Sequence, residues 1–576
     1  MATYFSARHL ARLTKKQLLT PLSFWQRRQW IFFIFICLGG ILLWRAINLQ
    51  ITHQDFLQKQ GEMRHVHTLP INAHRGTLVD RRGQLLAMSS PVDSVWIHPK
   101  QFKQSVARWS ELTSLLQLSL EDLQKIVEER KDKEFVYLKR HISPALGEEI
   151  TALNLTGVFL QREYRRYYPT GEIAAHVVGF TDIDEQGIEG LELAFDKYLK
   201  GVPGSKRVIK DKQGHIIADV EAVQMPLNGR QIQLSLDLRL QYLAYRELKA
   251  AVKQQQAKAA SAIILDVRTG EVLAMVNQPG YNPNNLQARQ SEHYRNRAVT
   301  DIFEPGSTLK PFTIAAALES GLYTPDTLVN TSPGSLQLDK YTVRDSRNYG
   351  IINVSSIIKY SSNVGASKIA LSLPKQILWE ILHNVGFGQS TVSGFPGETS
   401  GQLAHYRQWV PAKVATLSFG YGVNMTLLQL ARAYAIFGNE GIRPPIRFTP
   451  FHEQENIERY LPVPVLKAET ARQMLTMLTS VVSPEGTGNL AHIPNYQVAG
   501  KTGTARKLLP TGEYSNSDYL ALFAGIVPAS QPRLLMVILL DTPKGESYYG
   551  GKVAAPIFAR VMSHALHVLN IPPDGI

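Results

Sequence analysis

The stretch Glu304-Pro305-Gly306-Ser307-Thr308-Leu309-Lys310 places a serine three residues before a lysine, at the entry to an expected helix. The Pro-Gly pair breaks the preceding structure, whereas residues 312–318 are apolar and alanine-rich, with Gly321 as a plausible end cap. Positions i and i+3 share one face of a helix, so the Lys310 amine is expected beside the Ser307 hydroxyl. A desolvated lysine can take the proton of a serine hydroxyl and make it a nucleophile.

Ser-x-x-Lys by itself is a weak signal, because short motifs of common residues recur by chance. Residues Ser356-Ile357-Ile358-Lys359 fit the same pattern and have the composition of an ordinary helix face. The interpretation of Ser307 therefore depends on what the rest of the chain supplies.

The composition limits the classes of protein to which the chain can belong. A chain of 576 residues with 44% hydrophobic residues predicts more than one folded domain. The formal charge of +14 suits an anionic lipid or polymer, but we expect no nucleic-acid partner, since zinc-finger spacings and basic-aromatic arrays are absent from the sequence. The single cysteine, Cys37, excludes an intrachain disulfide and supports no cysteine-based metal site, and the histidines show no metal-ligand spacing.

The N-terminal region predicts a membrane anchor. Residues 1–28 carry six Lys or Arg and no Asp or Glu, and residues 30–44 are then apolar apart from a Gly-Gly pair. As a helix this run covers about 22 Å, less than the ~30 Å of a bilayer core, but Arg45 can snorkel and apolar residues follow it. Tryptophans end the run on both sides, and the basic tail marks its own side as cytoplasmic. Because no small-x-small cleavage site follows, we predict a tail at 1–28 and a single-pass anchor at 29–50, rather than a cleaved signal peptide.

Residues 51–235 have a different sequence pattern from the anchor. Residues 75–83 predict strand, turn and strand, and their charges either brace a domain junction or form a solvated turn. A capping-box pattern at 119–122 predicts a helix start, while residues 165–169 and 178–190 predict extended segments with turns. No nucleophile–base pair or metal-ligand cluster stands out, so the sequence predicts a structural or interaction domain here.

Residues 236–576 predict a mixed α/β domain with an antiparallel sheet between helices. The expected elements are helices at 238–252, 427–437 and 556–569, a hairpin of strands 262–267 and 272–276, and strands at 520–527 and 534–540.

A second candidate element is Ser361-Ser362-Asn363, which separates two short helical segments. A serine and an asparagine two residues apart can face one site, where Ser361 would relay a proton and Asn363 would bond a substrate amide. Taken alone, the same residues favour a plain turn.

A third candidate element is Lys501-Thr502-Gly503-Thr504, expected on a strand. Lys501 and Gly503 then share one face and the threonines the other. Lys501 adds positive charge, a threonine hydroxyl can hold a carboxylate, and Gly503 would let a substrate approach the backbone. The Gly-Lys-Thr in this segment is not a phosphate-binding loop, because that motif needs a glycine at the position of Asn495.

The three elements in this order resemble the signature of penicillin-binding proteins and serine β-lactamases. Nearly the whole chain is similar to the class B penicillin-binding proteins, and within them to the division-specific septal transpeptidases (the penicillin-binding protein 3 type). Further residues that carry the resemblance are the basic tail and anchor, 75–83, 167–169 with the following glycines, 296–310, 419–422, 501–506 and 548–551.

The resemblance implies a D,D-transpeptidase acting outside the cytoplasmic membrane on the D-Ala-D-Ala end of peptidoglycan stem peptides. Ser307 would attack the penultimate carbonyl, Lys310 would be the base, Ser361 would pass a proton to the leaving amine, and Asn363 would position the peptide. An amine of a neighbouring stem peptide would then accept the acyl group, and β-lactam antibiotics would acylate Ser307.

The resemblance also assigns the substrate contacts. Backbone N–H groups of Ser307 and Thr504 would form the oxyanion hole, and Lys501, Thr502, Gly503 and Thr504 would bind the substrate, with Lys501 and the threonines on its carboxylate. It implies no metal and no organic cofactor.

The family further implies a pedestal or dimerisation-type domain at 51–235, an elongated α+β structure that carries the transpeptidase domain at 236–576. The protein would sit in the bacterial inner membrane at the division septum, with its catalytic domain periplasmic. Its partners would include the septal glycosyltransferase and other divisome proteins. Alternatives are an elongation-type transpeptidase, a β-lactamase and a non-catalytic divisome scaffold.

Pro311 adds one local expectation. If the helix already includes Ser307, Pro311 cannot donate to the Ser307 carbonyl. We then expect an irregular, strained turn or a carbonyl that bonds solvent; if Ser307 lies before the helix, Pro311 is an ordinary first-turn proline.

Overall fold

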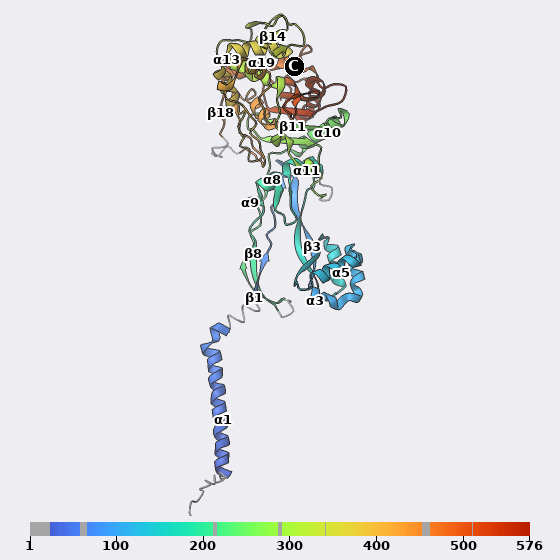
Figure 1. The fold of residues 1–576 in the computed structure, drawn as a ribbon, viewed down its shortest axis with the longest axis vertical. Helices are drawn as coiled ribbons and strands as arrows, with labels where there is room; N and C mark the ends of the chain where they lie inside the picture. The colour runs from blue at the N-terminus through green and yellow to red at the C-terminus, as the bar shows by residue number, and fades with distance from the viewer. Residues whose placement is uncertain are drawn as a thin grey trace, which may run out of the picture. The chain divides into compact units, whose positions relative to one another are not determined.

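The computed structural model describes residues 24–57, 66–210, 216–285, 291–339, 341–451, 461–509 and 511–575. The chain forms two compact units, one of residues 72–203 with 226–576 and the other of residues 1–71 with 204–225 (Figure 1). Each unit is described by itself below.

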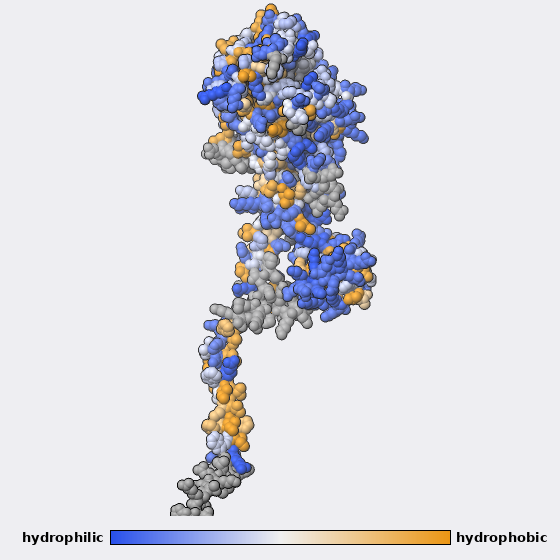
Figure 2. Space-filling view, in the orientation of Figure 1, coloured by the Kyte–Doolittle hydropathy of each residue, from blue (hydrophilic) through white to orange (hydrophobic). Residues whose placement is uncertain are grey.

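The first helix, α1 (Phe24–Ile47), is the apolar segment of the second unit, and a short π-helical turn (Asn48–Thr52) follows it. Residues 27–52 are long and apolar enough to cross a membrane, with none of the span buried, and no other described helix meets this test. Figure 2 shows its apolar side chains along the exposed surface of α1. The cationic residues before residue 24 lie outside the described part of the chain.

The second unit also contains a three-stranded antiparallel sheet in the order β1 (Val66–Ile71), β8 (Gly204–Lys210) and β9 (Ile216–Gln224). Strand β8 is central, so segments more than 130 residues apart in sequence are paired in register from Val66 with Ile209 to Ile71 with Gly204.

The pedestal part of the other unit is built on one long strand, β3 (Leu85–Ile97), which pairs antiparallel with β5 (Val158–Tyr167) along its length. Its sheet also holds β2 (Leu78–Val79), β4 (Val136–Ile142) and β10 (Ile232–Gln233). The helices packed on it are α4 (Trp109–Leu116), α5 (Leu120–Glu129) and α6 (Pro144–Ala152). The Ser119 hydroxyl caps α5 by accepting from the Asp122 N–H at 3.0 Å, as the capping pattern predicts.

Most extended segments expected in the pedestal are present, with one difference. Strands β2 and β3 flank a turn at 80–84, and β5 covers the segment before Pro169. Residues 178–190 are not wholly extended: β6 (Phe180–Thr181) and β7 (Gly187–Glu189) lie between α7 (Ala175–Val178) and α8 (Gly190–Ala194).

The charged side chains of segment 75–83 are not paired with one another, and Arg82 is exposed at the turn. Asp80 is buried, and its carboxylate accepts from the N–H groups of Arg82 at 2.8 Å and Leu238 at 3.2 Å. The Leu238 N–H starts helix α10 (Leu238–Gln254), so this turn is joined to the first helix of the transpeptidase region.

Arg75 belongs to a buried ionic network inside the pedestal. Its guanidinium bonds Glu192 at 2.6 Å and Asp196 at 2.6 Å, and Arg166 bonds the other Glu192 oxygen at 2.6 Å. The Glu192 side chain is fully buried, so one carboxylate bonds two guanidinium groups away from water, and Asp196 supplies the second negative charge.

Replacing Glu192 with alanine is therefore expected to destabilise the pedestal by about 3–5 kcal/mol, because Arg166 is left buried without a carboxylate. Hydrogen exchange of the β3 and β5 amides measures this loss as faster local opening. Glu128→Ala is the matched control: Glu128 bonds Lys103 and Lys131 on the surface, and its loss should change stability little. Equal exchange in the two variants would contradict a structural role for the network.

The C-terminal region, residues 236–576, is organised around a five-stranded antiparallel sheet in the order β12-β11-β21-β20-β19. The strands are β11 (Ala259–Asp266), β12 (Val272–Gln278), β19 (Ala499–Leu508), β20 (Tyr514–Val527) and β21 (Leu534–Asp541). This confirms the predicted hairpin, the two C-terminal strands and the antiparallel sheet.

Helices cover both faces of this sheet, as Figure 1 shows for α10 and α13. α10 and α21 (Ala555–Val568) pack in one apolar core with Phe523 of β20. α13 (Lys310–Glu319) and α18 (Leu427–Ala435) pack in the other, around Phe312. The remaining longer helices are α14 (Val354–Tyr360), α15 (Asn363–Ser372), α16 (Lys375–Asn384), α17 (Pro411–Leu417) and α19 (Ala468–Ser480).

Candidate active site

The serine loop is a single 3₁₀ turn, Gly306–Leu309, that runs directly into α13 at Lys310. The Ser307 carbonyl accepts from the Lys310 N–H. Ser307 therefore precedes the α-helix, and Pro311 is an ordinary first-turn proline. The condition for an irregular, strained turn at Ser307 is not met, so that suggestion fails.

The serine loop lies against β19, the last strand of the sheet. Gly306 has a left-handed φ of +53°, and a Cβ there would lie 3.1 Å from the Ala505 Cβ. A Cβ at Gly503 would lie 2.8 Å from Thr308 Cγ2 and 3.1 Å from the Pro305 carbonyl oxygen. The glycine of Lys-Thr-Gly thus makes room for the serine loop.

Lys310 is fully buried, and its Nζ has four oxygen atoms around it. They are Ser307 Oγ at 2.8 Å, the Ser361 carbonyl at 2.6 Å, Ser361 Oγ at 3.0 Å and Asn363 Oδ1 at 2.7 Å. Burial, followed by repulsion from Lys501, lowers the pKa of Lys310 well below its usual value. A neutral amine has a lone pair, so it can accept the Ser307 proton while still donating to two of the other oxygens.

The turn at 361–363 joins two helices and directs Ser361 and Asn363 toward Lys310. Ser361 ends α14 in a left-handed conformation with φ 61°, an unfavourable backbone for a serine. Ser362 begins α15, where its hydroxyl accepts from the Gly365 N–H at 2.9 Å. The middle serine therefore caps a helix, and Ser361 and Asn363 on either side of it contact the lysine.

Asp345 fixes this turn and was not identified from the sequence. One carboxylate oxygen accepts from the N–H groups of Asn363 at 2.5 Å and Val364 at 3.0 Å, and the other accepts from the Ser362 hydroxyl at 2.6 Å. Asp345 follows β15 (Tyr341–Arg344), 16 residues before Ser361, and no motif marks it. A negative charge at the N-terminus of α15 also complements the helix dipole.

Asp345→Ala is expected to slow acylation by penicillin about tenfold or more, because three hydrogen bonds that orient Ser361 and Asn363 are lost. Asp345→Asn should retain most of the rate, since an amide can accept from the two N–H groups and donate to Ser362. Stopped-flow acylation of both variants checks this. Equal rates for alanine and asparagine would argue against the positioning role.

Strand β19 supplies the opposite wall. Lys501 is fully buried, and its Nζ donates to Ser361 Oγ at 2.9 Å. Burial lowers the pKa of Lys501 to about 7. The Thr502 hydroxyl bonds the Thr487 hydroxyl at 3.0 Å, and Thr504 Oγ1 accepts from the Gly550 N–H at 3.0 Å. Ser361 Oγ therefore lies between two lysines, and Thr487 is a second contact that the sequence motifs did not reveal.

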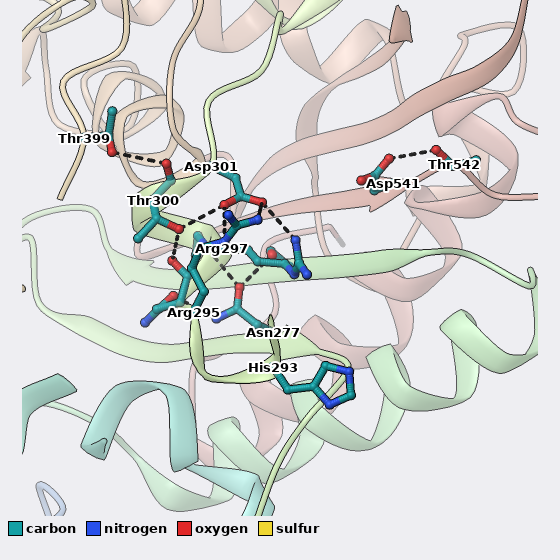
Figure 3. A network of polar contacts seen from close by, with 12 residues as sticks. Asn277, His293, Arg295, Arg297, Thr300, Asp301, Thr399, Asp541 and Thr542 are labelled. Atoms are coloured by element: carbon teal, nitrogen blue, oxygen red, sulfur yellow. Dashed lines mark hydrogen bonds and ion pairs between the residues drawn. The ribbon is translucent and has the colours of Figure 1, made fainter. Parts of the chain in front are cut away.

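The segment before the serine loop is held by polar contacts. In Figure 3, Arg295, Arg297 and Thr300 converge on the Asp301 carboxylate, with distances of 3.0, 3.1 and 2.9 Å. Glu304 is buried, and its Oε1 accepts from the Gly422 N–H at 2.5 Å. These contacts anchor the chain on the N-terminal side of the nucleophile loop.

The structure thus brings together the side chains of the three motifs. Ser307, Lys310, Ser361, Asn363 and Lys501 form one continuous set of hydrogen bonds. Ser356 and Lys359 of the second Ser-x-x-Lys lie on α14, where Lys359 bonds Glu485 at 2.8 Å. A serine beside a buried amine whose pKa is lowered, with a second hydroxyl between two amines, is an arrangement suited to acyl transfer. Among the described residues no group of three or more His, Cys, Asp or Glu side chains is placed to hold a metal ion.

Two family models match the chain. The penicillin-binding protein transpeptidase domain matches residues 260–563, and the penicillin-binding protein dimerisation domain matches residues 70–234. The first match covers the candidate site and the five-stranded sheet, and the second covers most of the pedestal.

Characterised relatives and solved structures agree with these matches. The chain is 40% identical to peptidoglycan D,D-transpeptidase FtsI of Escherichia coli K12, over 93% of this chain and 91% of FtsI. It is 39% identical to the probable peptidoglycan D,D-transpeptidase PenA of Neisseria meningitidis, over 97% and 95%. Its fold is similar to penicillin-binding protein 3 of Mycobacterium tuberculosis complexed with aztreonam, with a TM-score of 0.68 and 28% identity over 88% of this chain and 98% of that one. The chain therefore belongs to the class B penicillin-binding proteins, the family that joins a dimerisation domain to a transpeptidase domain.

Proposed function

We propose that this protein is a membrane-anchored peptidoglycan D,D-transpeptidase of the division septum, and that it works through an acyl-enzyme on Ser307. One observation carries the assignment of the nucleophile. Lys310 Nζ lies 2.8 Å from Ser307 Oγ in a fully buried position that favours the neutral amine.

Acylation would begin when Lys310 accepts the Ser307 proton and Oγ attacks the carbonyl between the last two D-alanines. The backbone N–H groups of Ser307 and Thr504 would hold the oxyanion, a contact worth about 10²–10³ in rate. Ser361, bonded to both lysines, would deliver a proton to the departing amine. Lys501, Thr502 and Thr504 would hold the terminal carboxylate, and Asn363 would bond the peptide backbone.

Deacylation would reverse these proton transfers. The amine of a neighbouring stem peptide would enter where the terminal D-alanine left, lose its proton through Ser361 and Lys310, and take the acyl group to form the crosslink. A β-lactam would acylate Ser307 by opening its ring, and the ring nitrogen would stay tethered to the acyl group.

Ser307→Ala should abolish covalent labelling by a fluorescent penicillin while the domain stays folded. Ser356→Ala is the matched control, because Ser356 occupies the serine position of the second Ser-x-x-Lys. Retained labelling of Ser307→Ala would place the nucleophile elsewhere. A labelled enzyme that released penicilloate within seconds would point to a β-lactamase instead.

The remaining proposals concern location and partners. We propose that α1 anchors the protein in the inner membrane with a cytoplasmic N-terminus, and that residues 51–235 form a pedestal which carries a periplasmic transpeptidase domain of residues 236–576. The septal glycosyltransferase and other divisome proteins would bind this pedestal. Depletion in the host should produce filaments, because septa would not be crosslinked. Rounded cells would indicate an elongation-type enzyme.

A further inference from the structure

Part of the connection between α19 and β19 crosses one end of the candidate site. We call residues 483–488, Ser-Pro-Glu-Gly-Thr-Gly, the strap. On one side Glu485 bonds Lys359 at 2.8 Å, and Lys359 lies two residues before Ser361. On the other side the Thr487 hydroxyl bonds Thr502 at 3.0 Å. The strap therefore connects the two walls that carry the second and third motifs.

The strap is a packed turn rather than a loose loop. The Gly486 N–H donates to the Ser483 carbonyl at 2.8 Å, and the Gly488 N–H donates to the Val481 carbonyl at 2.9 Å. A Cβ at Gly486 would lie 2.1 Å from the Val481 carbonyl oxygen, so only glycine fits there. The backbone of α20 (Gly550–Val553) touches the outer side, since a Cβ at Gly551 would lie 2.2 Å from the Thr487 carbonyl oxygen. These contacts leave the strap little room to move away from Thr502.

The contact between the strap and β19 indicates which end of a bound peptide would face the strap. Thr504, the proposed oxyanion donor, marks the reacting carbonyl. Of the three residues proposed to hold the carboxylate, Lys501 and Thr502 lie two to three residues before Thr504 on the strand, and the strap touches Thr502. The C-terminal end of a bound peptide therefore points at the strap.

We propose that the strap is a stop that admits only the free C-terminal end of a peptide to the site. A chain continuing past the terminal D-alanine would have to pass through the Glu485–Lys359 bridge or the Thr487–Thr502 contact. The enzyme would then attack the last peptide bond and spare identical bonds inside a longer chain or an existing crosslink. This specificity rests on the proposed acyl transfer at Ser307, with Lys359, Glu485 and Thr487 as its determinants.

Three thioesters of one acyl-D-alanine distinguish the effect of the length of the leaving group from the effect of its charge. They are given to the full-length protein in detergent. The leaving thiols are mercaptoacetate, which has a carboxylate at the terminal position, mercaptoacetamide, which lacks the charge, and mercaptoacetylglycine, which moves the carboxylate one residue further. Thiol release gives kcat/KM for each. The natural enzyme should cleave the glycine-extended thioester at least tenfold more slowly than mercaptoacetate. Equal rates for these two would overturn the proposal.

Two variants test the strap itself. Deletion of Glu485 and Gly486 should raise the extended-to-unextended rate ratio at least tenfold and leave the amide-to-unextended ratio unchanged. If the shortened chain fails to bind penicillin, the paired substitution Lys359→Met with Glu485→Gln decides; it should raise the same ratio about fivefold, the size expected for a partly exposed ion pair. Arg472→Met with Glu469→Gln removes another surface pair, on α19, and serves as control.

Failure of the strap proposal can be distinguished from failure of the proposed acyl transfer at Ser307. An unchanged extended-to-unextended ratio in the variant that binds penicillin would overturn the strap proposal and leave the acyl-enzyme intact. Thiol release by Ser307→Ala at the natural rate would instead overturn the acyl-enzyme on which the proposal rests.

Discussion

Replacing Lys310 with methionine is expected to slow acylation by penicillin about 10²–10⁴-fold, the range typical of a lost general base. Nζ is the only nitrogen described within hydrogen-bond distance of Ser307 Oγ, and its burial favours the neutral form that can accept a proton. Methionine has a similar length and fills the same buried space without a lone pair of comparable basicity. Stopped-flow fluorescence of the acylation step measures the loss.

Two controls distinguish loss of the general base from disruption of the fold. Lys310→Arg keeps a positive charge that cannot be removed near neutral pH, so it should be as slow as methionine. Lys368→Met, on α15 with its amine on the Asn330 carbonyl, should acylate at the natural rate. Thermal unfolding of Lys310→Met should be preserved, because the substitution removes an amine whose desolvation opposes folding. A methionine variant that acylates within threefold of the natural rate would assign the base elsewhere.

Replacing Lys501 with methionine is expected to reduce kcat/KM for carboxylate-bearing substrates about 10–100-fold, the size of a hydrogen bond to a charged group. The loss should appear with penicillin and with the mercaptoacetate thioester, which carry the carboxylate. It should be much smaller with the mercaptoacetamide thioester. An equal loss with all three would mean that Lys501 acts on Ser361 alone.

The pKa of Lys501 gives this prediction a pH dependence with a definite sign. Burial lowers that pKa to about 7, so the side chain is charged below this pH and neutral above it. Attraction for a carboxylate is therefore lost as pH rises through about 7. The carboxylate-to-amide selectivity, in which the Lys310 contribution cancels, should fall across neutrality. Lys501→Arg should abolish that fall, because arginine stays charged; a fall that persisted would contradict the assignment.

The sequence predicted the transpeptidase fold well because local signals there agree with the final packing. Apolar runs such as those now seen as β20 and β21 are strand-forming by composition and end in the buried sheet. Helix α14 is one of the two short helical segments expected beside Ser361, and it forms because Asn353 caps it and the serine turn ends it. The motif order was enough to bring Ser307, Lys310, Ser361 and Lys501 into one proposed site.

The parts that the sequence did not reveal depend on contacts between distant segments. Asp345 and Thr487 act through hydrogen bonds to Ser362 and Thr502, and nothing in their own neighbourhoods distinguishes them from other polar loop residues. The sequence also did not reveal which neighbour lies against Gly503. Strand periodicity places Gly503 on the face of Lys501, but only the packed structure shows that the serine loop occupies that face.

The most direct measurement is peptide mapping by mass spectrometry after the full-length protein reacts with benzylpenicillin. The account predicts one covalent penicilloyl group per chain, on the hydroxyl of Ser307, in a peptide that no longer gains mass in Ser307→Ala. A penicilloyl group on any other residue, or none on a folded protein, would contradict it.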